Sequence, residues 1–247
     1  METGKETIEK IEQLVNDRIT VEVGGKTYTP ANLRPVMYEP RVEETVVHSL
    51  EGFCGFINND IDKRINKTES LIVVNSHEKV RIISKSFGED LKRETQVVAL
   101  LGEPLETFPF GRFLSQEEFA IRFRSLFAQK EGDDFEYVLS YSSQLTGGTT
   151  IEGQDDGITQ QVSVKRGMSG ALKEKISLKP IVKLSPYRTF REITQPESEF
   201  LLRVRMDGNN NPTVALFEAD GGAWINQAMK NIVQYIQSLV KEIAVIA

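Results

Sequence analysis

The sequence predicts an α+β protein with mainly antiparallel sheets, a helical hairpin in the middle of the chain and a long C-terminal helix. Helical and strand patterns come in separate runs, without the regular βαβ alternation of a parallel sheet. Short β-branched segments end at turns that contain glycine or asparagine, as antiparallel strands do. The chain also ends in a long run of apolar residues at helical spacing. These observations define the fold class that we expect.

The chain begins with a pattern typical of a helix followed by a β-hairpin. Apolar residues at helical spacing predict an amphipathic helix over residues 5–18. Two short strands, 20–23 and 26–29, lie on either side of Gly24 and Gly25, which supply the positive φ values of a two-residue turn. We therefore expect a β-hairpin here.

The next segments predict a strand, a capped helix and a second hairpin. Ser49 can accept a hydrogen bond from the first turn of a helix over 50–62, which follows a β-branched strand over 42–48. Further strands are expected at 71–74, 79–84 and 96–101.

The middle of the chain carries strong helix signals. Ser115 and Glu118 form a capping box in front of an apolar stripe of phenylalanine and leucine. A second helix, over 134–145, follows Gly132. The two helices predict a helical hairpin.

Strands dominate beyond residue 146. The acidic, glycine-containing loop at 146–160 marks a candidate boundary between 1–146 and 147–247, unless the two parts form one continuous domain. Strands are expected at 160–165, 171–178, 181–184, 200–206 and 213–218, with a turn at 207–211. The terminal helix is expected to have an apolar face of Ile225, Met229, Ile232, Ile236, Leu239 and Ile243.

Composition argues against several classes of site and partner. A formal net charge of −6 argues against a protein whose whole surface binds nucleic acid or anionic lipid. Cys54 is the only cysteine and the only histidines are His48 and His77, so we expect these residues to be structural and expect no metal and no cofactor. A polar N-terminus without a long apolar segment predicts a cytoplasmic protein without a membrane partner. The terminal helix suits either docking within the chain or a subunit interface, and we expect a homo-oligomer.

Basic residues gather within this acidic protein. From residue 165 to residue 191, Glu174 is the only acidic residue. Lysine and arginine at strand spacing can hold phosphates, or they can form the solvated face of a sheet edge. This basic strip comprises Lys165, Arg166, Lys173, Lys175, Lys179, Lys183, Arg188 and Arg191.

A second group of arginines surrounds the turn sequence PYRTFREITQPE. Arg203 and Arg205 alternate with apolar residues on the following strand, so they share one face of it. With Arg188 and Arg191 they can clamp an anion, or all four can pair with nearby carboxylates.

The segment FEADGGAW joins a strand to the terminal helix. Gly221 and Gly222 lead into a helix N-terminus, which favours an anion, whereas Glu218 and Asp220 oppose one. Asp220 can simply cap the helix, or the two carboxylates can hold Mg²⁺ with a phosphate substrate. No complete catalytic motif is present, so we assign no catalytic residue and consider an enzyme the less expected outcome. The residues that we expect to bind an anionic ligand are Arg188, Arg191, Arg203, Arg205, Lys165, Arg166 and Trp224.

The motifs RTFREITQPESEF and ALFEADGGAW resemble a family of uncharacterised proteins encoded by tailed phages and prophages. The SLEGFCGFIN and SQEEFAIRF segments also stand in the order found in that family. The resemblance implies expression in the cytoplasm of an infected host, among genes for single-strand DNA proteins and for inhibitors of host defence. It implies no reaction.

Three functions are compatible with the sequence. The first is an accessory protein without enzymatic activity that binds an anionic ligand, such as a nucleotide signal of host antiviral defence, or a phage or host protein. The second is a replication or recombination factor that binds single-stranded DNA or a recombinase, so nucleic acid is the second choice of partner. The third is a Mg-dependent hydrolase that uses Glu218 and Asp220.

Overall fold

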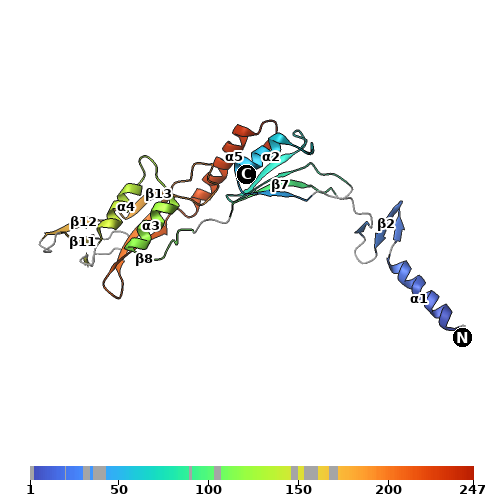
Figure 1. The fold of residues 1–247 in the computed structure, drawn as a ribbon, viewed down its shortest axis with the longest axis horizontal. Helices are drawn as coiled ribbons and strands as arrows, with labels where there is room; N and C mark the ends of the chain where they lie inside the picture. The colour runs from blue at the N-terminus through green and yellow to red at the C-terminus, as the bar shows by residue number, and fades with distance from the viewer. Residues whose placement is uncertain are drawn as a thin grey trace. The chain divides into compact units, whose positions relative to one another are not determined.

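The computed structural model describes residues 3–19, 21–29, 34–35, 43–88, 91–102, 107–145, 150–152, 161–166 and 172–247. The chain divides into two compact units, Met1–Glu43 and Glu44–Ala247. Helices and mainly antiparallel strands form both units (Figure 1), which confirms the predicted α+β class.

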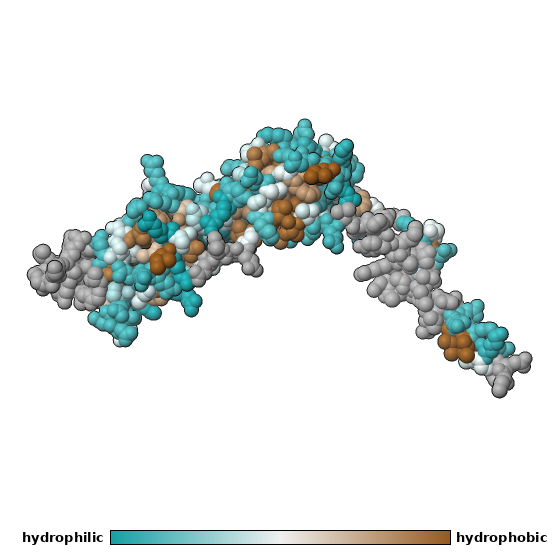
Figure 2. Space-filling model, viewed as in Figure 1, coloured by the Kyte–Doolittle hydropathy of each residue, from teal (hydrophilic) through white to brown (hydrophobic). Residues whose placement is uncertain are grey.

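The first unit consists of a helix and a small antiparallel sheet. The helix is α1 (Thr3–Ile19), and the strands, in the order β1-β2-β3, are β1 (Val21–Val23), β2 (Lys26–Thr29) and β3 (Arg34–Pro35). Gly24 and Gly25 have φ values of 59° and 78°, which glycine adopts at little cost, so the predicted hairpin turn is confirmed. Figure 2 shows a hydrophobic patch on α1, where the exposed apolar side chains are Ile8, Ile11 and Leu14.

A mixed five-stranded sheet forms one half of the second unit. Its strand order is β16-β5-β6-β7-β4; the two outer strands run parallel to their neighbours, and the inner pairs are antiparallel. The strands are β4 (Thr45–Val47), β5 (Leu71–Ser76), β6 (Lys79–Ile83), β7 (Thr95–Leu100) and β16 (Ala244–Ile246). Two helices that contact each other, α2 (Leu50–Asn59) and α5 (Ala223–Leu239), pack against this sheet (Figure 1).

The apolar residues between this sheet and its helices form the first core. Ile232 and Ile236, one helical turn apart on α5, are fully buried in it, and Phe53 of α2 is buried as deeply. Its buried members are Leu50, Phe53, Cys54, Ile57, Ile65, Ile72, Val74, Val80, Ile82, Val97, Ala99, Phe190, Ile193, Ile232, Ile236, Val240 and Ile243.

A fully antiparallel five-stranded sheet forms the other half of the second unit. Its order is β8-β15-β14-β13-β9, and the helices α3 (Gln116–Leu126) and α4 (Phe135–Gln144) pack together against it (Figure 1). The strands are β8 (Leu114–Ser115), β9 (Phe127–Ala128), β13 (Ile181–Pro186), β14 (Ser198–Met206) and β15 (Pro212–Glu218). Phenylalanine rings dominate the second core beneath these helices, with Phe123 lying 4.5 Å from Phe127 and 4.9 Å from Phe135, centroid to centroid.

A separate three-stranded antiparallel sheet contains the start of the basic strip. Its strands are β10 (Thr150–Glu152), β11 (Gln161–Arg166) and β12 (Leu172–Ser177). The register places Lys165 opposite Lys173. The predicted boundary between residues 146 and 147 lies outside the described residues.

The helical hairpin in the middle of the chain is confirmed, with one change in its cap. Ser115 Oγ accepts a hydrogen bond from the Glu118 N–H at 3.3 Å, as a capping box requires. The Glu118 carboxylate, however, pairs with Arg122 one turn further along, at 2.9 Å, where it gains a charged partner.

Two predicted helix ends are wrong. The pattern predicts a helix to residue 62, but α2 ends at Asn59 because Asp60 adopts a left-handed conformation, and its carboxylate accepts the N–H groups of the following turn. The predicted apolar face of the last helix includes Ile243, but α5 ends at Leu239. Ile243 is buried in the first core immediately before β16, whose parallel pairing with β5 is not visible in local periodicity.

Candidate ligand-binding site

A loop of the antiparallel sheet reaches into the other half of the second unit. Residues 187–197 join β13 to β14 and contain most of the PYRTFREITQPE motif; we call them the crossing loop. Phe190 and Ile193 are only 1% and 6% exposed, and both belong to the first core, although the flanking strands belong to the other sheet. The crossing loop therefore links the two halves by burying two apolar side chains.

Hydrogen bonds hold the crossing loop in this position. Thr189 Oγ1 donates to the carbonyl oxygen of His77, in the turn between β5 and β6. The Asn231 side-chain amide of α5 donates to the Thr194 carbonyl oxygen at 2.8 Å. Because these bonds satisfy polar groups beside buried apolar anchors, the loop has a defined path across the first half.

Glu192 of the crossing loop also caps α2. Its carboxylate accepts the Leu50 N–H at 2.6 Å and, more weakly, the Glu51 N–H at 3.4 Å. The Ser49 hydroxyl, the predicted N-cap, accepts the third N–H of the same turn at 3.0 Å. A carboxylate at the positive end of a helix is stabilising, so Glu192 adds to the attachment of the loop.

A cavity of about 630 Å³ lies beside the crossing loop, with walls from both halves of the second unit. This volume is in the usual range for small-molecule sites. Both histidines of the chain and its only tryptophan line the cavity. The aromatic and charged residues of its wall are His48, His77, Glu78, Phe108, Phe110, Tyr187, Arg188, Phe190, Arg191, Glu192, Glu218 and Trp224.

Aromatic rings surround the guanidinium of Arg188. The guanidinium carbon lies 3.9 Å from the centroid of the Trp224 ring, with Phe200 at 5.6 Å and Phe110 at 5.8 Å. The rings of His77 and Trp224 pack nearly perpendicular to each other, centroid to centroid at 4.8 Å. Ring faces attract cations, so these side chains position the guanidinium in the cavity wall.

Arg188 is also paired with polar groups. Its guanidinium donates to the Glu218 carboxylate and to the Ser198 hydroxyl, while its Nε–H has no hydrogen-bond partner in the described part of the chain. Burial lowers the pKa of Arg188 to about 10, and the negative charges of Glu218 and Asp220 oppose this lowering. The side chain, 11% exposed, therefore carries a positive charge at neutral pH.

Arg191 is the second cation of the cavity and has a different environment. Its guanidinium carbon lies 3.9 Å from the centroid of the Tyr187 ring, and the residue is exposed. Within the described ranges no carboxylate lies at ion-pair distance from it. Arg191 therefore offers the cavity an arginine fork without a counter-charge.

Each of the three carboxylates that the structure describes in the cavity wall has a polar partner of its own. Glu218 pairs with Arg188, and Glu192 accepts the N–H groups at the start of α2. Glu78 Oε1 lies 3.3 Å from His77 Nε2. The described cavity wall therefore contains more carboxylates than arginines, but none of these carboxylates is paired with Arg191.

The structure brings together three of the seven residues predicted to bind a ligand. Arg188, Arg191 and Trp224 line the cavity. Arg203 and Arg205 lie on β14, on the face away from the second core, as their alternation predicts, but the cavity wall does not include them. Arg203 has contacts of its own, and the Arg205 guanidinium stacks on Phe113 at 3.9 Å. Lys165 and Arg166 lie on β11, where the structure describes the backbone and not the side chains, so the prediction for these two residues lies outside the described part of the structure.

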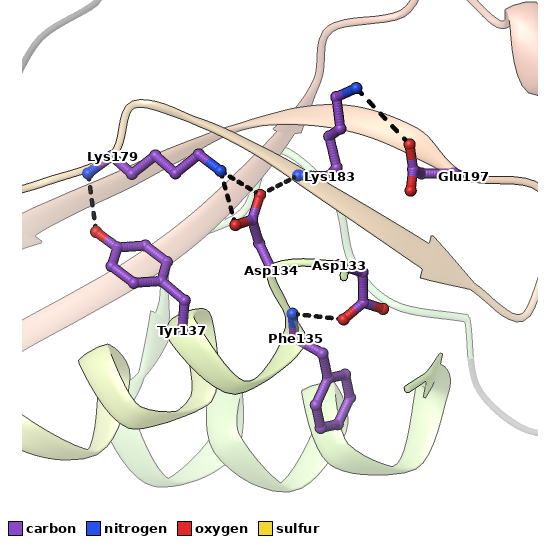
Figure 3. Close-up of polar contacts among 7 residues, drawn as sticks. All are labelled: Asp133, Asp134, Phe135, Tyr137, Lys179, Lys183 and Glu197. Atoms are coloured by element: carbon purple, nitrogen blue, oxygen red, sulfur yellow. Dashed lines mark hydrogen bonds and ion pairs between the residues drawn. The ribbon is translucent and has the colours of Figure 1, made fainter. Parts of the chain in front are cut away.

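Two lysines of the basic strip form part of the architecture instead (Figure 3). Both Asp134 carboxylate oxygens accept from Lys179 Nζ at 2.7 Å, and one of them accepts the Lys183 N–H at 2.8 Å. Lys183 Nζ lies 3.9 Å from Glu197, and the Lys179 N–H donates to the Tyr137 hydroxyl. These lysines join β13 to the start of α4.

The FEADGGAW segment contains both a turn and part of the cavity wall. Asp220 accepts the Gly222 N–H at 3.1 Å, and both glycines have positive φ, so this part of the motif makes the turn before α5. The N-cap of α5 is Gly222, without a side-chain cap hydrogen bond, so the predicted cap by Asp220 is wrong. Among the described residues, no group of three or more His, Cys, Asp or Glu side chains is placed to hold a metal ion. Glu218, the other carboxylate considered for Mg²⁺, is paired with Arg188.

Several residues of this wall could not be predicted from the sequence. The two histidines were expected to be ordinary structural residues, and no local signal places His48 of one loop beside His77 of another. Tyr187 is adjacent to Arg188, but its contact with Arg191 depends on the path of the crossing loop. Cys54 is buried in the first core as expected, and burial together with Glu192 raises the pKa of its thiol to about 11.

Comparisons with protein-family models, curated proteins and solved structures find no match for this chain. In the described part of the chain, no helix combines the length and the apolarity needed to cross a lipid bilayer.

Proposed function

We propose that this protein is a phage accessory protein that binds a small anionic ligand of the nucleotide class in the cavity beside the crossing loop. The observation that carries the proposal is the state of Arg191. Its exposed guanidinium is held on the Tyr187 ring at the cavity and has no carboxylate partner among the described residues. Arginine binds phosphate through two parallel hydrogen bonds, so Arg191 is suited to an incoming phosphate.

The aromatic walls support a ligand that also carries a planar ring. Trp224, Tyr187 and Phe110 are all partly exposed and all line the cavity. A nucleobase that stacks on an aromatic side chain gains about 1–3 kcal/mol. A ligand with both a ring and a phosphate can contact the aromatic side chains as well as the arginines, whereas a simple anion contacts the arginines alone.

The biological role that we propose is sequestration. The resemblance to phage-encoded proteins suggests a protein that acts in the cytoplasm of an infected host. There, a nucleotide signal of antiviral defence is a ligand of the right chemistry, and binding it without converting it would lower its free concentration.

Ligand titration tests this proposal. Because Trp224 is the only tryptophan and lies in the cavity wall, its fluorescence reports binding there, and isothermal titration calorimetry gives the affinity. The panel contains ADP-ribose and cyclic nucleotides. We expect at least one to bind, and we expect Arg191→Gln to weaken that binding about tenfold through loss of a charged hydrogen bond.

Arg205→Gln is the matched control. Arg205 also lies 3.9 Å from an aromatic ring, that of Phe113, but outside the cavity wall. We expect its substitution to leave the affinity unchanged. Absence of binding to every nucleotide in the panel, or an equal loss in both variants, contradicts the proposal.

A second candidate function, binding of single-stranded DNA, rests on the register of β11 and β12. The register pairs Lys165 with Lys173, and lysines at strand spacing can hold phosphates. Under this alternative, a fluorescent oligonucleotide binds at low salt, its affinity falls steeply as salt rises, and Lys165→Gln weakens it. An oligonucleotide that stays unbound at low salt excludes direct contact with DNA.

A further inference from the structure

The buried cation of the cavity is held by contacts that do not depend on its ion pair. The Arg188 guanidinium stacks on Trp224 at 3.9 Å and donates to the Ser198 hydroxyl at the start of β14. Only 11% of the side chain is exposed. The position of this charge is therefore set by the rings and the hydroxyl around it.

The partner carboxylate is held much less firmly. Glu218 is the last residue of β15, and its side chain is 45% exposed. The donor that the structure gives its carboxylate is Arg188, and the chain then turns at Gly221 and Gly222. A half-exposed carboxylate can exchange its contact with an arginine for contacts with water, whereas the enclosed guanidinium cannot.

We infer that Glu218 is an internal counter-anion, which the anionic group of a bound ligand displaces from Arg188. The inference rests on the proposed function and adds the residue that competes with the ligand. A buried guanidinium without an anion is costly, so the cavity holds Glu218 against Arg188 until another anion takes its place. Exchange of one anion for another keeps the charge of this wall balanced.

Displacement of Glu218 adds a cost to the binding of any anion at Arg188. An inorganic phosphate that binds Arg188 must compete with a tethered carboxylate and gains no stacking in return. A nucleoside phosphate meets the same competition but also stacks on the partly exposed rings of Trp224 or Tyr187. Glu218 therefore weakens the binding of every anion at Arg188, and the stacking of a ring offsets this cost for ring-bearing anions alone.

The test compares Glu218→Gln with Glu199→Gln. Glu199 is an exposed carboxylate on the neighbouring strand, outside the cavity wall, so both variants lose the same charge. Inorganic phosphate and ADP-ribose are titrated against the full-length wild type and both variants, with Trp224 fluorescence and calorimetry as readouts. We expect Glu218→Gln to bind both probes about tenfold more tightly, and Glu199→Gln to match the wild type.

The outcomes separate this inference from the proposed function. If both variants bind the probes more tightly by the same factor, the loss of one negative charge explains the effect. If Glu218→Gln binds them more weakly than the wild type, Glu218 contacts the ligand directly. Either result overturns the inference. If the wild type binds ADP-ribose and Glu218→Gln binds it equally well, the proposed function stands and the inference fails. If neither protein binds any probe, the proposed function fails. Glu218→Ala is included because the glutamine in Glu218→Gln can form a new hydrogen bond to Arg188. The melting temperatures of the two variants are compared to detect such a bond.

Discussion

Lys179 and Lys183 differ sharply from Arg188 and Arg191, although all four belong to one basic strip. The two lysines lie on the surface of the antiparallel sheet and meet carboxylates of α4 and of the crossing loop (Figure 3). The two arginines lie in the crossing loop, where one is enclosed by rings and the other has no carboxylate partner in the described residues. Positive charge thus serves structure at these two lysines of the strip and faces a cavity at its C-terminal arginines.

The difference teaches that a run of basic residues does not by itself define a binding surface. Asp134 pairs with Lys179 across 45 positions of the chain, which turns a solvated cation into an attachment of α4. Arg188 meets Trp224 and Glu218 only because the crossing loop is anchored in the first core. Three contacts can be tested in turn: the burial of Phe190 that anchors the crossing loop, the Glu192 cap of α2, and the surface ion pair between Lys179 and Asp134.

The largest effect is expected from the anchor. Phe190→Ala removes a ring that is 1% exposed, and such a loss costs about 3–5 kcal/mol of the free energy of unfolding. Urea denaturation followed by circular dichroism measures it. Cys54 in the same core gives a second readout: its buried thiol should react slowly with a thiol reagent in the wild type and faster in the variant.

Ile181→Ala is the control for this prediction, because Ile181 lies on the adjoining strand and is 39% exposed. We expect it to cost less than about 1 kcal/mol. Equal destabilisation by the two variants would show that the crossing loop is not anchored by Phe190. The contrast between the lysines and the arginines of the strip would then have no physical basis.

An intermediate effect is expected from the cap. Glu192→Gln keeps an oxygen that can accept the Leu50 N–H but removes the negative charge at the start of α2, and we expect a loss of about 1 kcal/mol in the free energy of unfolding. Hydrogen exchange of the first amides of α2 should accelerate. Glu51→Gln, in the same turn, removes a charge whose carboxylate makes no cap, so a similar acceleration there would argue against the specific role of Glu192.

The smallest effect is expected from the surface ion pair. A double-mutant cycle with Lys179→Gln and Asp134→Asn should give a coupling energy of about 0.5–1 kcal/mol, since the lysine side chain is half exposed. Chemical denaturation at low and high salt measures it, and the coupling should shrink as salt rises. Nucleotide affinity should not change; a loss as large as that of Arg191→Gln would mean that the whole strip binds the ligand.

Much of the local structure is visible in the sequence because its causes are local. Gly24 and Gly25 predict their turn through backbone freedom, and Ser49 and Ser115 predict helix starts through their hydroxyl acceptors. The ends of α2 and α5 were predicted wrongly. The capping contacts of Asp60 and the pairing of β16 with β5 compete with helical periodicity and are not part of it.

The sequence by itself therefore determined the α+β class, most of the helices and strands, and the set of arginines worth examining. Only the tertiary structure decided that Arg188, Arg191 and Trp224 line one cavity and that Arg203 and Arg205 lie elsewhere. The physical reason is that charges and rings select partners by distance in space. The crossing loop sets those distances by burying Phe190 and Ile193 in a core that its own strands do not form.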